Sequence, residues 1–121
     1  MLKRIIVAAA LAAVGPASAG AQPLEVYVAF IGPNDHFNSR GVRLTEPWQI
    51  IRQDRANYHR FGIRDPGDEW DSYFASAANR DRMERMILNG YIDPVARNQI
   101  VNGNAWIRVE IYPDSVRVTV N

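Results

Sequence analysis

The stretch AWIRVEIYPDSVRVTV, residues 105–120, holds two runs in which apolar and polar residues alternate, on either side of Pro113-Asp114-Ser115. A period of two predicts β-strands, and a short turn-forming segment between two such runs predicts a hairpin. We therefore expect one strand over Ala105–Tyr112 and a second over Val116–Val120. The residues expected to share the apolar faces of this hairpin are Ile107, Val109, Ile111, Val116, Val118 and Val120.

A third strand is expected near the other end of the chain, over Leu24–Ile31, where apolar and polar positions also alternate. The pattern leaves open which strand of the hairpin it pairs with. The alternation places Val26, Val28 and Phe30 on one side of the strand, and Glu25 and Tyr27 on the other.

The segment between these strands is helical in pattern. Because all strands lie at the ends of the chain, we expect an α+β fold: a small antiparallel sheet, made of the N-terminal strand and the C-terminal hairpin, with three to four helices inserted between them and packed on one face. The expected helices are Trp48–Phe61, capped by Thr45 or Glu46 with Pro47 in its first turn and ended by Gly62; Glu69–Ala78, capped by Asp68; Arg80–Asn89, capped by Asn79 and ended by a left-handed Gly90; and a short helix from Asp93-Pro94 to Asn102-Gly103.

The first 21 residues have the pattern of a secretory signal peptide. Lys3 and Arg4 precede the apolar run Ile5–Val14, and small residues follow, with Ala19-Gly20-Ala21 favoured over Ala17-Ser18-Ala19 as the cleavage site. The apolar run is too short to span a membrane as an uncleaved anchor. We therefore expect a periplasmic or secreted protein in which residues 22–121 form a single α+β domain without a transmembrane segment.

Composition excludes several classes of function. The chain has 121 residues and no cysteine, which excludes disulfides, thiol nucleophiles and cysteine-ligated metals. The whole chain has 14 basic and 13 acidic residues, and the predicted leader removes two of the basic ones, so there is no strong nucleic-acid signal. Lys3 is the only lysine. Coding bias or selection for planar groups that bind phosphate and carboxylate would both produce this abundance of arginine.

The expected helix at Trp48–Phe61 is the most informative segment for function. At about 100° per residue, Ile50, Ile51, Tyr58 and Phe61 fall within one apolar arc that also contains Asp54. A carboxylate in such an arc needs a partner, so we expect Asp54 to act as a structural pin or, alternatively, as a tuned acid or base.

Beside this arc lies a stripe of four side chains: one tryptophan, two arginines and one histidine. It predicts a surface for an anionic ligand or for an acidic patch on an envelope protein, although a solvated helix face would have the same composition. Our leading hypothesis is a small, exported, non-catalytic binding or interaction module of the cell envelope without a cofactor. Its expected ligand-binding residues are Trp48, Arg52, Arg55 and His59 from the helix, with Arg40 and Arg43 from the preceding loop.

Two alternative functions remain open. One is a small secreted hydrolase, nuclease-like, that uses His36 and His59 with Asp35 or Asp54 as acid–base groups; no zinc-binding spacing is present, so no metal is expected. The other is a structural or inhibitory partner protein that docks through exposed tryptophan or tyrosine. A further acidic cluster is expected to cap a helix and to neutralise the arginines; its members are Asp65, Asp68, Glu69 and Asp71.

Overall fold

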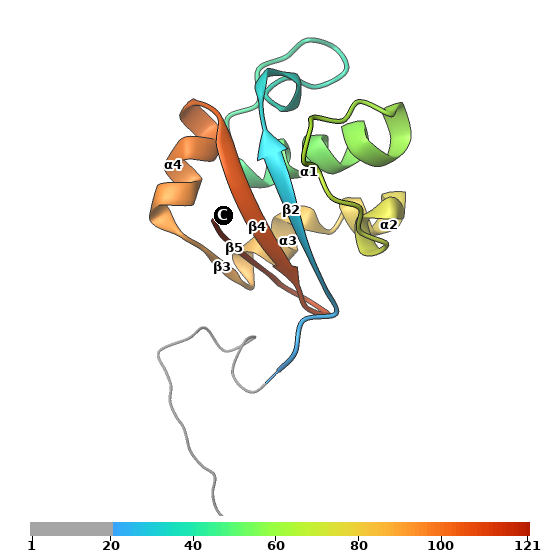
Figure 1. Cartoon of the computed structure of the whole chain (residues 1–121), viewed down its shortest axis with the longest axis vertical. Helices are drawn as coiled ribbons and strands as arrows, with labels where there is room; N and C mark the ends of the chain where they lie inside the picture. The colour runs from blue at the N-terminus through green and yellow to red at the C-terminus, as the bar shows by residue number, and fades with distance from the viewer. Residues whose placement is uncertain (1–20) are drawn as a thin grey trace, which may run out of the picture.

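The computed structural model describes residues 21–121, so the predicted signal peptide lies outside the described residues apart from Ala21. Within that range, no helix has the length and apolar character needed to cross a lipid bilayer. The elements, shown in Figure 1, are β2 (Glu25–Ile31), α1 (Pro47–Ala56), α2 (Ala77–Arg80), α3 (Met83–Leu88), β3 (Tyr91–Ile92), α4 (Pro94–Asn102), β4 (Ala105–Ile111) and β5 (Val116–Val120), with short 3-10 turns at Pro33–Asp35 and Tyr73–Ala75 and a π-helical turn at Asn57–Phe61.

The four strands form one sheet in the order β2-β4-β5-β3. The C-terminal hairpin is confirmed, since β4 and β5 pair antiparallel with Val109 opposite Val118. The N-terminal strand pairs antiparallel with β4, so that Glu25 lies opposite Ile111. The strand β3 was not predicted, because two residues are too few for an alternating pattern; it pairs in parallel with β5 and makes the sheet mixed.

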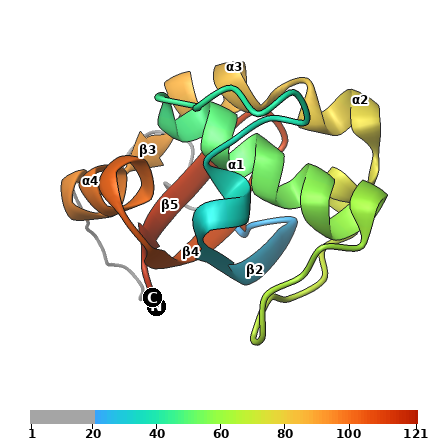
Figure 2. The same ribbon diagram turned by 90° about the horizontal axis from the view of Figure 1, so that it is seen from above.

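The helices gather on one side of the sheet, which confirms the predicted α+β class (Figure 2). Helix α1 packs on β2, α3 on β5, and α4 on both strands of the hairpin. On β2 the face turned toward the helices carries the buried residues Tyr27, Ala29 and Ile31. Val26 lies on the other side and is 37% exposed, so the side of the strand that looked more apolar in the sequence is the one away from the helices.

The first and last predicted helices begin within one residue of the expected positions. Helix α1 begins at Pro47, after Glu46, and the side chain of Gln49 accepts hydrogen bonds from the backbone N–H groups of Thr45 and Glu46. Helix α4 begins at Pro94, and the carboxylate of Asp93 caps it by accepting from two backbone N–H groups.

The two middle helices are shorter than predicted. Helix α3 lies within the expected range Arg80–Asn89 but begins at Met83, after Arg82 rather than Asn79. The segment expected to be helical over 69–78 is irregular until the 3-10 turn Tyr73–Ala75, and α2 begins only at Ala77, where the hydroxyl of Ser76 accepts from the N–H of Asn79. Residues 68–72 instead bind the edge of β2 and the side chains of α1. Tertiary contacts have therefore overridden a good local helical pattern.

Two glycines matter for different reasons. Gly62 ends the helical segment, as predicted, and has the left-handed conformation, with φ of 68°. Gly90 does not have the predicted left-handed conformation, since the positive-φ glycines of residues 21–121 are Gly41, Gly62 and Gly67. A Cβ atom at position 90 would lie 1.9 Å from the carbonyl oxygen of Val116, so glycine is needed there for the close approach of β5.

Candidate functional site

A π-helical turn at Asn57–Phe61 continues α1 and determines where its side chains point. Its i→i+5 hydrogen bond runs from the N–H of Gly62 to the carbonyl of Asn57. More residues occupy each turn, so successive side chains rotate by less than the about 100° of an α-helix. The side chain of Phe61 therefore falls short of the predicted apolar arc in its rotation about the helix axis. It is 45% exposed, although the sequence pattern predicted that it would be buried. The other predicted members of the arc, Ile50, Ile51, Asp54 and Tyr58, are buried.

Arg55 lies at the centre of a buried ionic network rather than on the surface. Its side chain has no exposed area; Nε donates to Asp54 at 2.9 Å, and Nη1 donates to Asp71 at 2.8 Å and to the carbonyl of Glu69 at 3.0 Å. Its guanidinium also lies over the ring of Tyr27, 4.0 Å from the centroid. Asp54 is thus paired with an arginine, as the structural-pin interpretation predicts.

The buried groups of this network shift one another's pKa values. Burial raises the pKa of Asp54, and the adjacent guanidinium of Arg55 opposes that rise. Burial alone would lower the pKa of Arg55, but the neighbouring acidic groups outweigh it, so that the pKa of this guanidinium is raised. Arg55 therefore stays charged inside the protein, where Nε and Nη1 are engaged and Nη2 has no described hydrogen-bond partner, and it is not part of an exposed anion-binding stripe.

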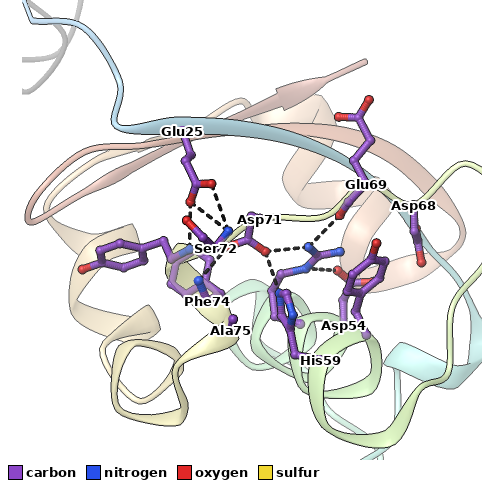
Figure 3. Close-up of polar contacts among 12 residues, drawn as sticks. Glu25, Asp54, His59, Asp68, Glu69, Asp71, Ser72, Phe74 and Ala75 are labelled. Carbon is purple, nitrogen blue, oxygen red and sulfur yellow. Dashed lines mark hydrogen bonds and ion pairs between the residues drawn. The ribbon is translucent and has the colours of Figure 1, made fainter.

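His59 is held by the same carboxylate. Its Nε2 atom lies 2.8 Å from Oδ1 of Asp71, the oxygen that also accepts from Arg55, and Figure 3 shows Asp71 beside His59. The ring of Trp70 lies edge-on to the imidazole, with the centroids 4.9 Å apart. The predicted stripe is therefore divided: Arg55 and His59 are engaged by Asp71, while Arg52 remains outside and stacks on Trp48 at 5.1 Å.

The acidic cluster caps a strand edge instead of a helix. The N–H of Phe30 donates to Asp68 at 2.8 Å, and the N–H of Val28 donates to Glu69 at 2.9 Å. Nearby, the carboxylate of Glu25 accepts from the N–H of Ser72, as Figure 3 shows. The contacts of Asp68 and Glu69 occupy backbone N–H groups on the free edge of β2, whereas the side chain of Glu25 binds the backbone of the segment beside it. The sequence shows the acidic cluster, but it does not indicate that the cluster binds the edge of β2.

The arginines of the preceding loop also have structural surroundings. The guanidinium of Arg43 donates to the carbonyls of Leu44 and Val101, and so ties the loop to α4. Arg40 is exposed, and only its backbone N–H makes a described contact, to Asn38 at 2.9 Å. Neither residue makes a described contact with Arg52.

The residues of the hydrolase hypothesis lie in two separate contacts. Nε2 of His36 is bonded to the carbonyl of Ile100 on α4 at 2.9 Å, whereas His59 is bonded to Asp71. Within residues 21–121, no group of three histidine or acidic side chains is placed to hold a metal ion. Asp35 is buried and accepts from the N–H of Gly32 at 3.0 Å; burial raises its pKa to about 6, although the hydrogen bonds it accepts lower it.

A cavity of about 280 Å³ lies between α1, its π-helical turn and α2. Three arginines line it, Arg52, Arg60 and Arg80, and they face one carboxylate, Asp81. Arg80 is buried, and its Nη1 donates to the carbonyls of Phe74 and Ala75 at 2.8 and 3.1 Å. None of the three forms an ion pair with another described residue. We call this cavity the arginine pocket.

A second cavity, of about 310 Å³, lies on the other flank of the same helix, against the loop that follows β2. None of the described residues that line it is charged. Its walls combine aromatic, aliphatic, amide and hydroxyl groups, and we call it the amide pocket. The lining residues are Pro33, Asn34, Phe37, Asn38 and Ser39 from the loop, and Gln53, Asn57, Phe61 and Ile63 from the helical segment and its end.

Comparison of the chain with protein-family models, with curated proteins and with solved structures gives no match. The site is therefore described from the residues of this chain only.

Proposed function

We propose that this protein is a small exported binding module of the cell envelope, periplasmic or secreted and non-catalytic, which binds a small anion in the arginine pocket. The observation that carries the proposal is that three guanidinium groups line one cavity against a single carboxylate. Three guanidinium groups beside one carboxylate leave a net positive charge in the cavity, and a phosphate or carboxylate ligand compensates that charge.

The arginines of the pocket are held in ways that leave N–H groups available to a ligand. Arg52 and Arg60 lie with their guanidiniums over the rings of Trp48 and Phe61, at 5.1 and 4.9 Å from the centroids. Stacking uses the faces of the guanidinium planes, whereas hydrogen bonds to an anion use their edges. Arg80 is fixed by two backbone carbonyls, which engage one of its three nitrogen atoms. This arrangement supports binding to a site that is already formed.

This proposal differs from the sequence-based hypothesis in its residues. Arg55 and His59 are replaced by Arg60 and Arg80, because Asp71 engages the former pair. Arg60 lies in the same row along the helix as Ala56 and Arg52. The π-helical turn produces this row, because residues four apart differ less in their angle about the helix axis there than in an α-helix.

The proposal is tested by titrating inorganic phosphate into the protein and following backbone amide shifts by NMR at ~0.02 M and ~0.5 M ionic strength. We expect saturable shifts in residues 52–60 and 77–81 that weaken at high salt. Arg60→Ala, at an exposed position, is expected to weaken binding by about tenfold, since a charge-assisted hydrogen bond is lost.

Arg85→Ala is the matched control, because Arg85 is an exposed arginine of α3 outside the pocket and its removal changes the net charge equally. Equal weakening by both variants would show a diffuse electrostatic effect and would contradict the proposal, as would the absence of localised shifts.

A further inference from the structure

The two pockets adjoin along one helix. Gln53 lines both of them. The amide pocket is lined by Gln53, Asn57 and Phe61, each four residues apart, while the arginine pocket is lined by the parallel row Arg52, Ala56 and Arg60. The π-helical turn keeps both rows in line to their last member. A ligand can therefore contact one row with a neutral part and the other with an anionic part.

The amide pocket offers hydrogen-bonding groups that the protein itself does not use. The Nε2 atom of Gln53 donates to Asn57 at 2.9 Å, and Oε1 of Gln53 has no described partner. Oδ1 of Asn38 accepts from two backbone N–H groups, which leaves its Nδ2 atom free within the described chain. The side chains of Asn34 and Ser39 also make no described hydrogen bond. Amide and hydroxyl groups of this kind both donate and accept, as the hydroxyl groups of a sugar do.

Asn57 holds this wall in position. It is buried; Nδ2 donates to the carbonyl of Asn34 at 3.1 Å and to Asp35 at 3.0 Å, and Oδ1 accepts from Gln53. All its polar atoms are thus engaged, so it acts as a positioning residue for Gln53. The orientation of Gln53 at the junction of the pockets is fixed before any ligand arrives.

Aromatic surface completes the neutral half of the site. Phe37 and Phe61 line the amide pocket and are each 45% exposed. A flat aromatic face packs well against the C–H groups on one face of a sugar ring, while the hydroxyl groups at the ring edge reach the surrounding amides. Within residues 21–121, this lining contains no charged side chain, which suits a neutral ring.

We propose that the two pockets form one site for an acidic sugar, a cyclic polyol carrying a phosphate or carboxylate group. The sugar ring lies in the amide pocket against Phe37 and Phe61, and the anionic group lies among Arg52, Arg60 and Arg80. This inference rests on the proposed function, since it requires the arginine pocket to bind an anion.

The test compares four probes by NMR titration: inorganic phosphate, glucose, glucose 6-phosphate and glucuronate. We expect glucose 6-phosphate to bind at least about tenfold more tightly than either phosphate or glucose, because the two halves are linked in one molecule. The comparison of glucose 6-phosphate with glucuronate identifies which anionic group the pocket prefers.

Variants separate the two halves of the site. Phe37→Ala is expected to weaken binding of glucose 6-phosphate by about fivefold, the effect of losing one aromatic contact. It is expected to leave binding of inorganic phosphate unchanged, because the guanidinium over its ring is that of Arg43, which lies outside the arginine pocket. Phe37→Leu keeps an apolar side chain without the ring and is expected to be intermediate. Tyr91→Ala removes an exposed aromatic residue of β3 outside both pockets and should have no effect.

The outcomes distinguish this inference from the proposed function. If phosphate binds and glucose 6-phosphate binds no better, or if Phe37→Ala leaves both affinities unchanged, the acidic-sugar site is overturned while the anion site stands. If neither phosphate nor any sugar acid or sugar phosphate binds, both proposals fail. Tight binding of glucose alone would overturn the division of the site into a neutral and an anionic half.

Discussion

Nη1 of Arg55 lies 2.8 Å from Oδ1 of Asp71, and neither side chain has any exposed surface. The contact joins α1 to the segment that follows the next loop, sixteen residues further along the chain. Removing one partner leaves a buried charge incompletely compensated, which costs several kcal/mol. We expect Asp71→Asn to lower the free energy of unfolding by about 3 kcal/mol, measured by urea denaturation.

The control for this prediction is Asp114→Asn. Asp114 pairs with Arg82 at 2.9 Å, but the side chain of Asp114 is 79% exposed. Exposed ion pairs contribute about 0–1 kcal/mol, so this variant should unfold almost like the wild type. Similar losses in the two variants would show that the buried network is not a main source of stability.

Gly90→Ala is predicted to be severely destabilising. Its Cβ atom would meet the backbone oxygen of Val116 at 1.9 Å, and a backbone atom in a paired strand cannot move aside without breaking the ladder. We expect a loss of at least about 3 kcal/mol in the free energy of unfolding. Gly103→Ala is the matched control, because the nearest atom to its Cβ is 4.0 Å away, and it should change stability little. A mild effect of Gly90→Ala would mean that β5 shifts easily.

The edge of β2 provides a third prediction. In the double variant Asp68→Ala/Glu69→Ala, the N–H groups of Phe30 and Val28 lose their carboxylate acceptors. We expect hydrogen exchange of these two amides to accelerate by about tenfold or more, and the protein to self-associate at high concentration, since an unprotected strand edge pairs with other chains. NMR exchange and light scattering measure the two effects. Glu84→Ala, which removes an exposed carboxylate of α3, should leave both unchanged.

Asp35 is expected to give stability a measurable pH dependence. Its pKa is about 6 in the folded protein, above the ordinary value of 3.8, so the folded state binds the proton more tightly than the unfolded state. Its contribution to stability is therefore full below about pH 4 and is lost as pH rises through about 6, a change of about 3 kcal/mol.

The measurement is the free energy of unfolding of the wild type minus that of Asp35→Asn, followed from about pH 4 to about pH 8. We expect the difference to fall across this range. A flat difference would show that the carboxyl group titrates normally in the folded protein.

Much of the fold could be predicted because it depends on local patterns. The hairpin of β4 and β5 shows a period of two, and the starts of α1 and α4 carry Pro47 and the Asp93-Pro94 pair. The failures concern contacts between distant segments. The apolar residues of 69–78 have helical spacing, yet the carboxylates at the start of this segment accept hydrogen bonds from β2 and from Arg55. The positions of these donors depend on the whole fold.

The candidate site could be predicted only in part for the same reason. Arg52 was identified from its helical position, and it lines the arginine pocket. Arg80 was missed because it comes from another helix, and Arg55 was misplaced because Asp71 approaches it only in three dimensions. Arg60 and Phe61 depend on the π-helical turn, which hydrophobic spacing does not indicate.

That wide turn has an evolutionary consequence. Removing a single codon between positions 57 and 61 would let a regular α-helix resume, and the residues after the deletion would rotate around the helix axis. Arg60 and Phe61, which continue the rows of Arg52 and Gln53, would change their positions together. Both pockets could thus be gained or lost in one genetic event, without any change in the sheet.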